Sequence, residues 1–521
     1  MPTKKKAAPV FKAYDPEQIL FLPPSLSELI AAHHPSRVVS EVIDKLDLQP
    51  LLQAYTGGGC SSYHPKMLLK VVVYGYMTNV YSSRKLEEAC KSNIYFMWLA
   101  AMNTPHHNTI NIFRSTKLQE PLKKIFTQIV ELLANEGLLS IKEAYTDGTK
   151  IEANANKYTF VWGNAIKTNK EKMAKQLEAI WQETQRKTAI ENEDKTPTDF
   201  SSIDKQKVQQ VVAKIDEAIK DKPTTKKFRQ KLRYIKNNYE NNLDKYEKQE
   251  AIIGEGRSSY SKTDTDATFM RMKDDHMMNG QLKAAYNVQV SSNNQFVTNY
   301  TLHQSATDTT TYPTHLENYK QCHQTLPETA IADAGYGSEE NYEYLEQNNI
   351  TAYVKYNQFD REQKESIQSK NPFTPDKLFY NNEKDFYVCP MGQKMHNTGT
   401  HAQKTTTGFV QTITTYQAKN CSQCPLNGAC HKSKRNRIIS INHNLNKHKQ
   451  QAKQNLQSET GIAHRKKRCW DTEPIFGNIK NNHHFKKFML RGLKKVTVET
   501  GLLSIAQNLR KKATINAKNA A

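Results

Sequence analysis

The sequence has no long apolar run. Its most hydrophobic stretch, residues 67–77, is interrupted by Lys70 and Gly75. A membrane-spanning helix needs roughly 20 consecutive apolar residues, which this sequence does not supply. The lysines at positions 4–6 are not followed by an apolar segment, so we expect no secretory signal. These absences predict a cytoplasmic protein without membrane attachment.

Acidic residues are scarce relative to basic ones. In 521 residues, 52 Asp and Glu stand against 74 Lys and Arg, which gives a net charge of +22. An excess of this size predicts a polyanionic partner, with nucleic acid first and an anionic membrane second. A chain of this length also exceeds what one hydrophobic core supports, so we expect three or more modules.

Cysteine is sparse and unevenly distributed, because four of the eight lie between Cys389 and Cys430. The pair Cys421 and Cys424, with Cys430 downstream and Cys389 upstream, fits four thiolates on a structural Zn²⁺. Residues 380–440 have few large apolar side chains, so a metal would help to hold them in one shape. Unliganded reduced cysteines are the alternative. The others are expected at ordinary buried positions: Cys60, Cys90, Cys322 and Cys469.

Hydrophobic periodicity predicts two helical regions. From Pro35 to about Glu136, apolar residues recur at helical spacing, and polar turns carry basic residues such as Arg84 and Arg114. Helices joined in this way suit a DNA-binding bundle, and an ordinary helical bundle fits the composition equally well. Residues 161–256 are lysine-rich and predict an insertion of two or three helices.

Elsewhere the pattern changes to period two and predicts an α/β region with a mixed sheet. Strands are expected over residues 141–153, 285–290, 296–302, 329–333 and 351–355, with helices over 309–323 and after Ser338. Asp147 lies within the first strand and Asp333 at the end of a later one, where α/β folds place their sites. Because Asp-Gly also favours a tight turn, a hairpin at Asp147-Gly148 is the alternative.

A third carboxylate stands near the end of the chain. Thr472-Glu473-Pro474 predicts the start of a helix, because proline suits the first helical position. Gly477 and Lys480 follow Glu473 at four and seven residues, so all three would share one helical face. That face suits a metal site approached closely by a phosphate backbone. The alternative is that the helix dipole alone favours an acid at this position.

The segments around these three acids resemble the motifs of bacterial insertion-sequence transposases of the DDE class. The matching residues are 146–153, 332–337 and 473–480. Residues 488–496 are similar to that group's C-terminal tail, and residues 64–114 resemble its N-terminal helical domain. The resemblance covers most of residues 35–510, and the glutamate motif is its most specific part.

This resemblance implies a ribonuclease-H-like core in which Asp147, Asp333 and Glu473 bind two Mg²⁺ or Mn²⁺ ions and catalyse phosphodiester chemistry. It also implies that the cysteine cluster is an insertion between the second aspartate and the glutamate. Five other acids rank lower because none ends a clear strand: Asp264, Asp266, Asp274, Asp275 and Asp308.

Basic residues beside these motifs are the expected DNA contacts. Lys480 matches the lysine that such enzymes place beside terminal DNA. Their arginine usually precedes the glutamate by four positions, where this chain has Cys469, and Arg468 stands one residue earlier, so its role stays open. The remaining candidates are Arg491, Lys494, Arg84 and Arg114.

We therefore expect the following organisation. Residues 1–34 form a flexible arm, 35–136 a helical DNA-binding domain, 137–160 with 257–356 the catalytic core, 161–256 a helical insertion, 357–460 the cysteine-containing insertion, 461–512 the glutamate-bearing helical region and 513–521 a tail.

The predicted function is a DNA transposase that cleaves the ends of an insertion sequence and joins them to target DNA. The resemblance implies double-stranded DNA as the partner, a homodimer in the DNA complex, and the bacterial cytoplasm and nucleoid as the location. One alternative is a catalytically inactive DNA-binding repressor of the same descent, against which the presence of all three acids argues. The other is a ribonuclease-H-like nuclease without strand transfer, since water and a DNA 3′-hydroxyl can use the same metal site.

Overall fold

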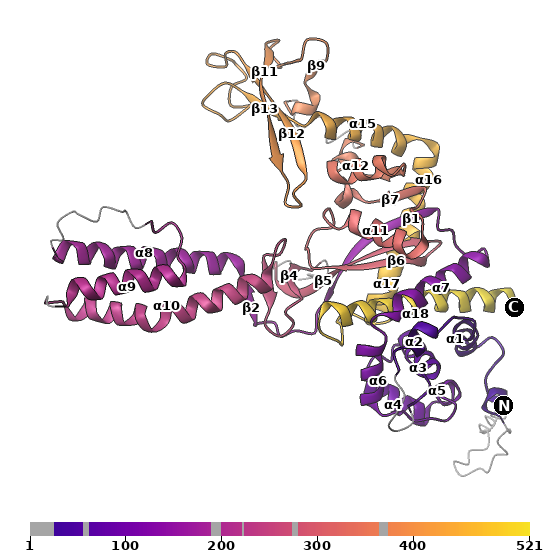
Figure 1. The fold of residues 1–521 in the computed structure, drawn as a ribbon. Helices are drawn as coiled ribbons and strands as arrows, with labels where there is room; N and C mark the ends of the chain where they lie inside the picture. The colour runs from indigo at the N-terminus through magenta and orange to yellow at the C-terminus, as the bar shows by residue number, and fades with distance from the viewer. Residues whose placement is uncertain are drawn as a thin grey trace, which may run out of the picture.

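A computed structural model describes residues 25–55, 62–188, 199–220, 223–272, 280–363 and 373–520. A central mixed sheet is surrounded by a helical bundle, a long helical arm and a second, smaller sheet (Figure 1). Most of the expected N-terminal arm lies outside the described residues, and so do Cys60, Asp274 and Asp275.

The N-terminal region is helical, as its periodicity predicts. Its helices are α1 (Pro35–Asp44), α2 (Gln49–Leu52), α3 (Pro65–Met77), α4 (Ser83–Ser92), α5 (Ile94–Leu99), α6 (His107–Ile112), the π-helical η2 (Phe113–Lys117) and α7 (Pro121–Asn135), preceded by the short η1 (Leu26–Leu29). Prolines at the start of α1, α3 and α7 occupy positions where no amide hydrogen is needed. Helix α3 is buried on nearly all sides and forms the centre of this bundle.

The central sheet has the order β4-β5-β1-β7-β8, and β6 also pairs with β5. Its strands are β1 (Glu143–Glu152), β4 (Thr268–Arg271), β5 (Leu282–Asn293), β6 (Phe296–His303), β7 (Thr329–Ala332) and β8 (Thr351–Val354). Strands β1, β7 and β8 are parallel, whereas β5 runs antiparallel to β1, β4 and β6. Helices α11 (Tyr312–His323) and α12 (Glu339–Gln347) precede β7 and β8 as crossovers. The expectation of a mixed α/β sheet is confirmed.

The hairpin alternative for Asp147-Gly148 is wrong. Strand β1 pairs with β5 without a break from Tyr145 to Glu152, so both residues lie inside a continuous strand. The hairpin in this sheet instead joins β5 to β6 through Asn294 and Gln295, which both adopt left-handed backbone angles.

The insertion after β1 forms a projecting arm (Figure 1). Strands β2 (Phe160–Trp162) and β3 (Ser259–Ser261) pair at its base, and the arm consists of α8 (Gly163–Thr188), α9 (Lys205–Ile219) and α10 (Lys226–Ile253). Its own apolar core includes Leu177, Ile215 and Leu232. Because α10 runs back to the base, the arm leaves and rejoins the central sheet region at neighbouring points.

The cysteine-containing region is a second antiparallel sheet with the order β13-β12-β11-β10-β9. Its strands are β9 (Phe379–Asn381), β10 (Phe386–Val388), β11 (Lys394–Lys404), β12 (Val410–Ala418) and β13 (Ile438–Ile441), preceded by α13 (Phe359–Glu362) and η4 (Pro375–Lys377). Contrary to expectation it has an apolar core, which includes Tyr387, Met395, Tyr416 and Ile439. Helix α15 (His443–Gln457) leads from this sheet back to β8 and α12.

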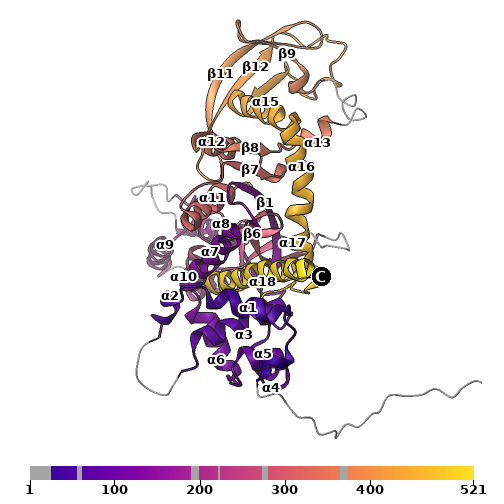
Figure 2. The same ribbon diagram turned by 90° about the vertical axis from the view of Figure 1, so that its right-hand side faces the viewer.

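The C-terminal region returns to the central sheet through α16 (Glu459–Asp471), α17 (Glu473–Gly477), the π-helical η5 (Asn478–Asn482) and α18 (Leu493–Ala520). Helix α18 lies between the N-terminal bundle and the sheet and contacts α1, α3, α7 and β6 (Figure 2). It is buried on most of its circumference, as expected for a helix enclosed by two layers. The N-terminal bundle and the C-terminal helix α18 therefore pack on each other.

A buried polar network joins the bundle to α18. Glu499 is fully buried, and its carboxylate accepts hydrogen bonds from the Tyr76 hydroxyl at 2.8 Å and from the Leu490 amide at 2.8 Å. Arg114 Nη1 lies 3.9 Å from the same carboxylate and donates to the Tyr81 carbonyl at 2.7 Å. Burial raises the pKa of Glu499, and the Arg114 cation opposes that rise.

Replacing Arg114 with methionine removes the cation that faces this buried carboxylate. Because breaking a buried charge pair costs about 3–5 kcal/mol, we expect R114M to lower the free energy of unfolding by about that amount in urea denaturation. The control is Arg84→Met on the exposed side of α4. This substitution should change the free energy of unfolding by less than about 0.5 kcal/mol. Similar small changes in both variants would contradict a stabilising role for the pair.

Candidate active site

The pairing of β1 with β7 places Asp147 beside Asp333. The two strands run parallel with Thr146 opposite Ala332, so the next residue of each chain lies at the same level. Strand β7 ends at Ala332, and Asp333 begins the short 3-10 turn η3 (Ala334–Tyr336). The Asp333 carboxylate accepts the Gly335 amide at 2.8 Å, and the Asp147 carboxylate, 9% exposed as a residue, accepts the Gly148 amide at 2.8 Å.

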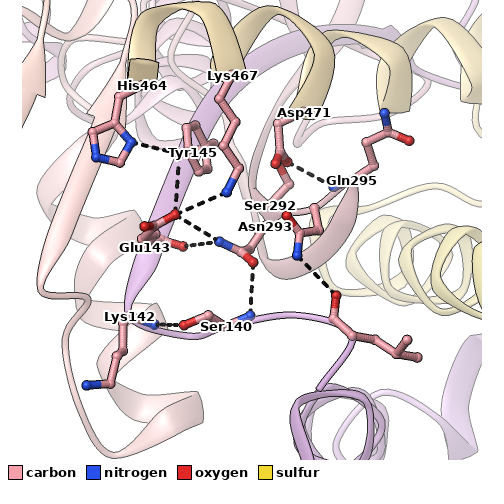
Figure 3. A network of polar contacts seen from close by, with 12 residues as sticks. Ser140, Lys142, Glu143, Tyr145, Ser292, Asn293, Gln295, His464, Lys467 and Asp471 are labelled. Atoms are coloured by element: carbon pink, nitrogen blue, oxygen red, sulfur yellow. Dashed lines mark hydrogen bonds and ion pairs between the residues drawn. The ribbon is translucent and has the colours of Figure 1, made fainter. Parts of the chain in front are cut away.

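Helix α16 crosses the face of the sheet that carries Tyr145 and Asp147. These residues share a face because side chains alternate along a strand. The Tyr145 hydroxyl lies 2.8 Å from His464 Nδ1, and Lys467 Nζ lies 3.2 Å from the Glu143 carboxylate (Figure 3). These contacts set the direction in which α16 approaches β1.

The end of α16 is anchored on β5 by a second set of bonds. Asp471 is fully buried, and its carboxylate accepts the Ser292 hydroxyl at 2.6 Å and the Gln295 amide at 3.0 Å (Figure 3). Ser292 is opposite Tyr145 in the β1–β5 register. The chain then runs along the sheet as far as Lys487, which bridges to Glu152. Glu473, two residues after Asp471, thus begins α17 over the same face as Asp147.

Glu473 stands at the start of a helix, as the sequence predicts, and Arg468 is its partner. The Arg468 guanidinium lies 3.5 Å from Glu473 Oε1, and the Glu473 side chain is 53% exposed. Arg468, five residues before Glu473, is therefore within ion-pair distance of this carboxylate. The α-helical spacing that would put Glu473, Gly477 and Lys480 on one face does not continue to Lys480. Lys480 lies in η5, which is π-helical and therefore has a different rotation per residue.

A further carboxylate, Asp308, one of the acids ranked lower from the sequence, also lies in this region. Its Oδ1 accepts hydrogen bonds from Asn287 Nδ2 at 2.8 Å and Gln289 Nε2 at 2.9 Å, both on β5. Gln289 is opposite Gly148 in the β1–β5 register. Sequence patterns carry little signal for Asp308, because it lies in a polar loop between β6 and α11 and not at a strand end.

The other acids that ranked lower have structural roles where they are described. Asp264 accepts the Tyr286 hydroxyl at 2.9 Å and the Gly492 amide at 3.1 Å, while Asp266 accepts the Leu493 amide at 2.7 Å. Both therefore hold the start of α18.

Three carboxylates act on one buried phenol. Burial raises the pKa of Tyr336 well above its usual value, and the negative charges of Asp308, Asp147 and Asp333 add to this effect. The Tyr336 hydroxyl donates to Gln289 Oε1, so this side chain stays protonated and links the turn after β7 to β5.

The predicted acids do not form a closely spaced ligand set. Within the described residues, only Glu87, His106 and His107 bring three donor atoms of this kind within 4.8 Å of one another. Glu87 there accepts the His107 amide at 2.9 Å and pairs with Lys91 at 2.8 Å, and these bonds lower its pKa to about 2. This cluster is explained by Glu87 holding the start of α6 against α4.

The four clustered cysteines line one cavity of about 20 Å³ in the second sheet region. No three of their sulfurs, all of which belong to described residues, lie within 4.8 Å of one another. The Arg437 guanidinium instead lies 2.8 Å from Cys430 Sγ, and its amide lies 3.4 Å from Cys421 Sγ. Of the remaining cysteines, Cys90 is buried as expected, whereas Cys469 is exposed.

The predicted DNA contacts divide by exposure. Arg84, Arg491 and Lys494 are exposed. Arg114 is 3% exposed and bonded within the bundle, so its position does not fit a DNA contact. Lys480 is 8% exposed and is also turned away from solvent. Spacing alone did not distinguish these buried cations from surface ones.

Comparisons with known families point to transposases. Residues 388–513 match a family described as "Transposase DDE domain", and residues 24–116 match one described as "Transposase domain (DUF772)". Neither the curated proteins nor the solved structures yielded a match. The two family matches confirm the resemblance to insertion-sequence transposases of the DDE class.

The family matches indicate transposition in general, and with it DNA as substrate and the use of divalent metal. The first matched segment contains Glu473 and the four clustered cysteines, whereas Asp147 and Asp333 lie outside both segments. None of the described helices combines the length and the hydropathy that crossing a membrane would require.

Replacing Gly148 with alanine tests how tightly this region is packed. A Cβ at Gly148 would lie 2.4 Å from Gln289 Nε2 and 2.8 Å from Asp308 Oδ1, which is closer than such atoms approach. We expect the free energy of unfolding to fall by about 1–3 kcal/mol in urea denaturation. Gly477→Ala is the control, because nothing lies within 4 Å of its Cβ position and alanine favours the helix. A G148A variant as stable as the parent would contradict this packing.

Proposed function

We propose that the chain is an active DNA transposase, which cleaves DNA at the ends of its element and joins those ends to target DNA. The observation that carries this proposal is the β1–β7 register, which sets Asp147 and Asp333 side by side. Glu473 begins α17 two residues after Asp471, which is bonded to Ser292 of β5, and this supports an approach of Glu473 to the same face of β1. A central strand with antiparallel partners on one side and parallel partners on the other also supports a ribonuclease-H-like core.

The donor set fits divalent cations such as Mg²⁺ or Mn²⁺. All three side chains offer carboxylate oxygens, the hard ligands that these ions prefer. Asp147 is nearly buried, whereas Glu473 is half-exposed and paired with Arg468. Joining the three acids on cations requires the Glu473 side chain to leave Arg468. A bound pair of cations would stabilise the attacking and leaving oxygens of phosphodiester transfer.

The protein's own residues supply position and charge. Asp471, bonded to Ser292 and Gln295, fixes the start of α17 and with it the backbone of Glu473. When released from Glu473, Arg468 would present a guanidinium to a DNA phosphate, for which its planar fork is suited. The exposed cations Arg84, Arg491 and Lys494 are the proposed further contacts with DNA. In the proposed DNA complex, a homodimer holds both ends of the element.

The two alternatives make different predictions for the same site. An inactive repressor would bind the element ends without metal-dependent cleavage. A nuclease without strand transfer would cleave but yield no joined product. The placement of Asp147 and Asp333 favours catalysis over repression, because a purely DNA-binding protein has no need for aspartates on neighbouring strands.

We expect Asp333→Asn to abolish Mg²⁺-dependent cleavage of a plasmid that carries the DNA flanking this gene. An amide is a poor Mg²⁺ ligand, and since second-shell changes at metal sites already cost about 10–100-fold, loss of a ligand should exceed about 100-fold. DNA binding, measured by gel shift, should stay near the parent value because the variant loses only one negative charge.

Asp360→Asn is the matched control, since this exposed acid pairs only with Lys355 among the described contacts. Cleavage that survives in D333N, or that fails equally in D360N, would reject the assignment. Binding without cleavage in the parent protein would favour the repressor, and cleavage without joined products would favour the nuclease.

We also propose that Cys389, Cys421, Cys424 and Cys430 hold a structural Zn²⁺. All four line one small cavity of about 20 Å³, so a single ion there would lie within reach of each cysteine. The Arg437 guanidinium lies 2.8 Å from Cys430 Sγ on the rim of this cavity. Zinc binding would require the Arg437 guanidinium to leave Cys430 as the sulfurs close around the ion.

The purified protein should contain zinc by elemental analysis. Removal by a chelator should open protease sites between Tyr387 and Arg437 without unfolding the central sheet, because that sheet has its own core. Cys421→Ser should reduce the zinc content, whereas Cys322→Ser, in the remote helix α11, should not. Protein without zinc, with unchanged proteolysis after chelation, would reject this role.

A further inference from the structure

The loop between β6 and α11 directs one side chain towards the candidate active site. Asp308 lies four residues before α11, whose N-cap residue is Thr311. The main chain of Asp308 holds this turn, because its carbonyl accepts the Thr311 amide at 3.0 Å and the Thr311 hydroxyl at 2.7 Å. The Asp308 carboxylate is therefore left to face the sheet.

Two glycines make room for this carboxylate, and each belongs to one of the aspartate segments. A Cβ at Gly148, next to Asp147, would lie 2.8 Å from Asp308 Oδ1. A Cβ at Gly335, two residues after Asp333, would lie 3.8 Å from Asp308 Oδ2 and 3.0 Å from Asp333 Oδ1. The carboxylates of Asp308 and Asp333 thus approach the same point, and Asp308 spans the space between the two segments.

The two oxygens of Asp308 have different surroundings. Oδ1 accepts the amides of Asn287 and Gln289, which fix the orientation of the carboxylate plane. Oδ2 is the oxygen on the side of Gly335 and Asp333. The loop itself is tied to that turn, because the Thr309 hydroxyl donates to the Gly335 carbonyl at 2.8 Å. Such support is typical of a metal ligand held by outer-shell hydrogen bonds.

We propose that Asp308 is a fourth carboxylate of the metal site and binds a divalent cation together with Asp333. This inference rests on the proposed function, because it concerns the same cations. It adds a ligand from the α11 side of the sheet, opposite the α16 and α17 side from which Glu473 comes. The cation would then be held from both faces at the end of β7.

The test is Mn²⁺ binding to the full-length protein without DNA, measured by calorimetry and by the electron paramagnetic resonance of free Mn²⁺. Asp308→Asn preserves shape and an oxygen that can accept from Asn287 and Gln289, so the fold should survive, as circular dichroism can verify. We expect Mn²⁺ affinity to fall at least about 10-fold, the lower end of what even outer-shell changes cost. Asp216→Asn in the arm, where the acid pairs with Lys236, is the matched control and should bind Mn²⁺ as the parent does.

Asp333→Asn, measured in parallel, distinguishes a failure of the Asp308 assignment from a failure of the proposed metal site. If D333N loses Mn²⁺ binding and D308N keeps it, the proposed site stands and Asp308 is a structural residue only. If D308N and D333N both bind Mn²⁺ as the parent does, the proposed metal site itself is rejected. Loss in both variants, with D216N unchanged, supports the four-carboxylate site.

If D308N does not fold, Asp308→Glu gives a second test. The longer acid keeps the charge, so a merely structural role would leave the variant as impaired as D308N. Recovery of Mn²⁺ binding in D308E above the level of an Asp308→Ala variant would support the ligand role, and equal binding in the two would overturn it.

Discussion

The structure depends on the position of β1 between β5 and β7. One edge of this strand is bonded antiparallel to β5 from Tyr145 to Glu152, and the other is bonded parallel to β7 up to Thr146. A slip of one residue would reverse every side chain of the strand and send Asp147 to the opposite face. The same slip would remove Tyr145 from α16. The register therefore fixes at once the position of Asp147, its level relative to Asp333 and the approach of the glutamate-bearing helix.

Buried polar side chains between β5 and its helices enforce that register. His315 of α11 is fully buried and lies within hydrogen-bonding distance of the Ser291 and Thr301 hydroxyls, at 2.8 and 2.7 Å. Burial lowers the pKa of His315 well below its usual value, so the ring is neutral and can serve both hydroxyls. On the other face Asp471 is bonded to Ser292. An alternative register would leave these groups buried without partners, which costs about 1–3 kcal/mol for each group.

Helix α18 joins the N-terminal bundle and the central sheet in one common core. It is enclosed by the N-terminal bundle on one side and the central sheet on the other, and Glu499 binds both Tyr76 of α3 and the chain just before α18. The arm and the second sheet, in contrast, have apolar cores of their own. Changes within the arm or the second sheet should therefore disturb the candidate active site less than changes at α18, where the N-terminal bundle meets the central sheet.

The sequence by itself predicted the elements of the helical bundle and of the central sheet, and it singled out three carboxylates as site candidates. Alternation and helical spacing are local properties, so they predicted the strands around Asp147 and Asp333, the helices of the bundle and the helix that starts at Glu473. What only the tertiary structure decided are the properties that depend on distant partners. Long-range pairing with β5 overrode the Asp-Gly turn signal, Arg114 is buried beside Glu499, and Asp308 is held against β5 by Asn287 and Gln289. None of these contacts leaves a local pattern, because each joins segments that folding alone brings together.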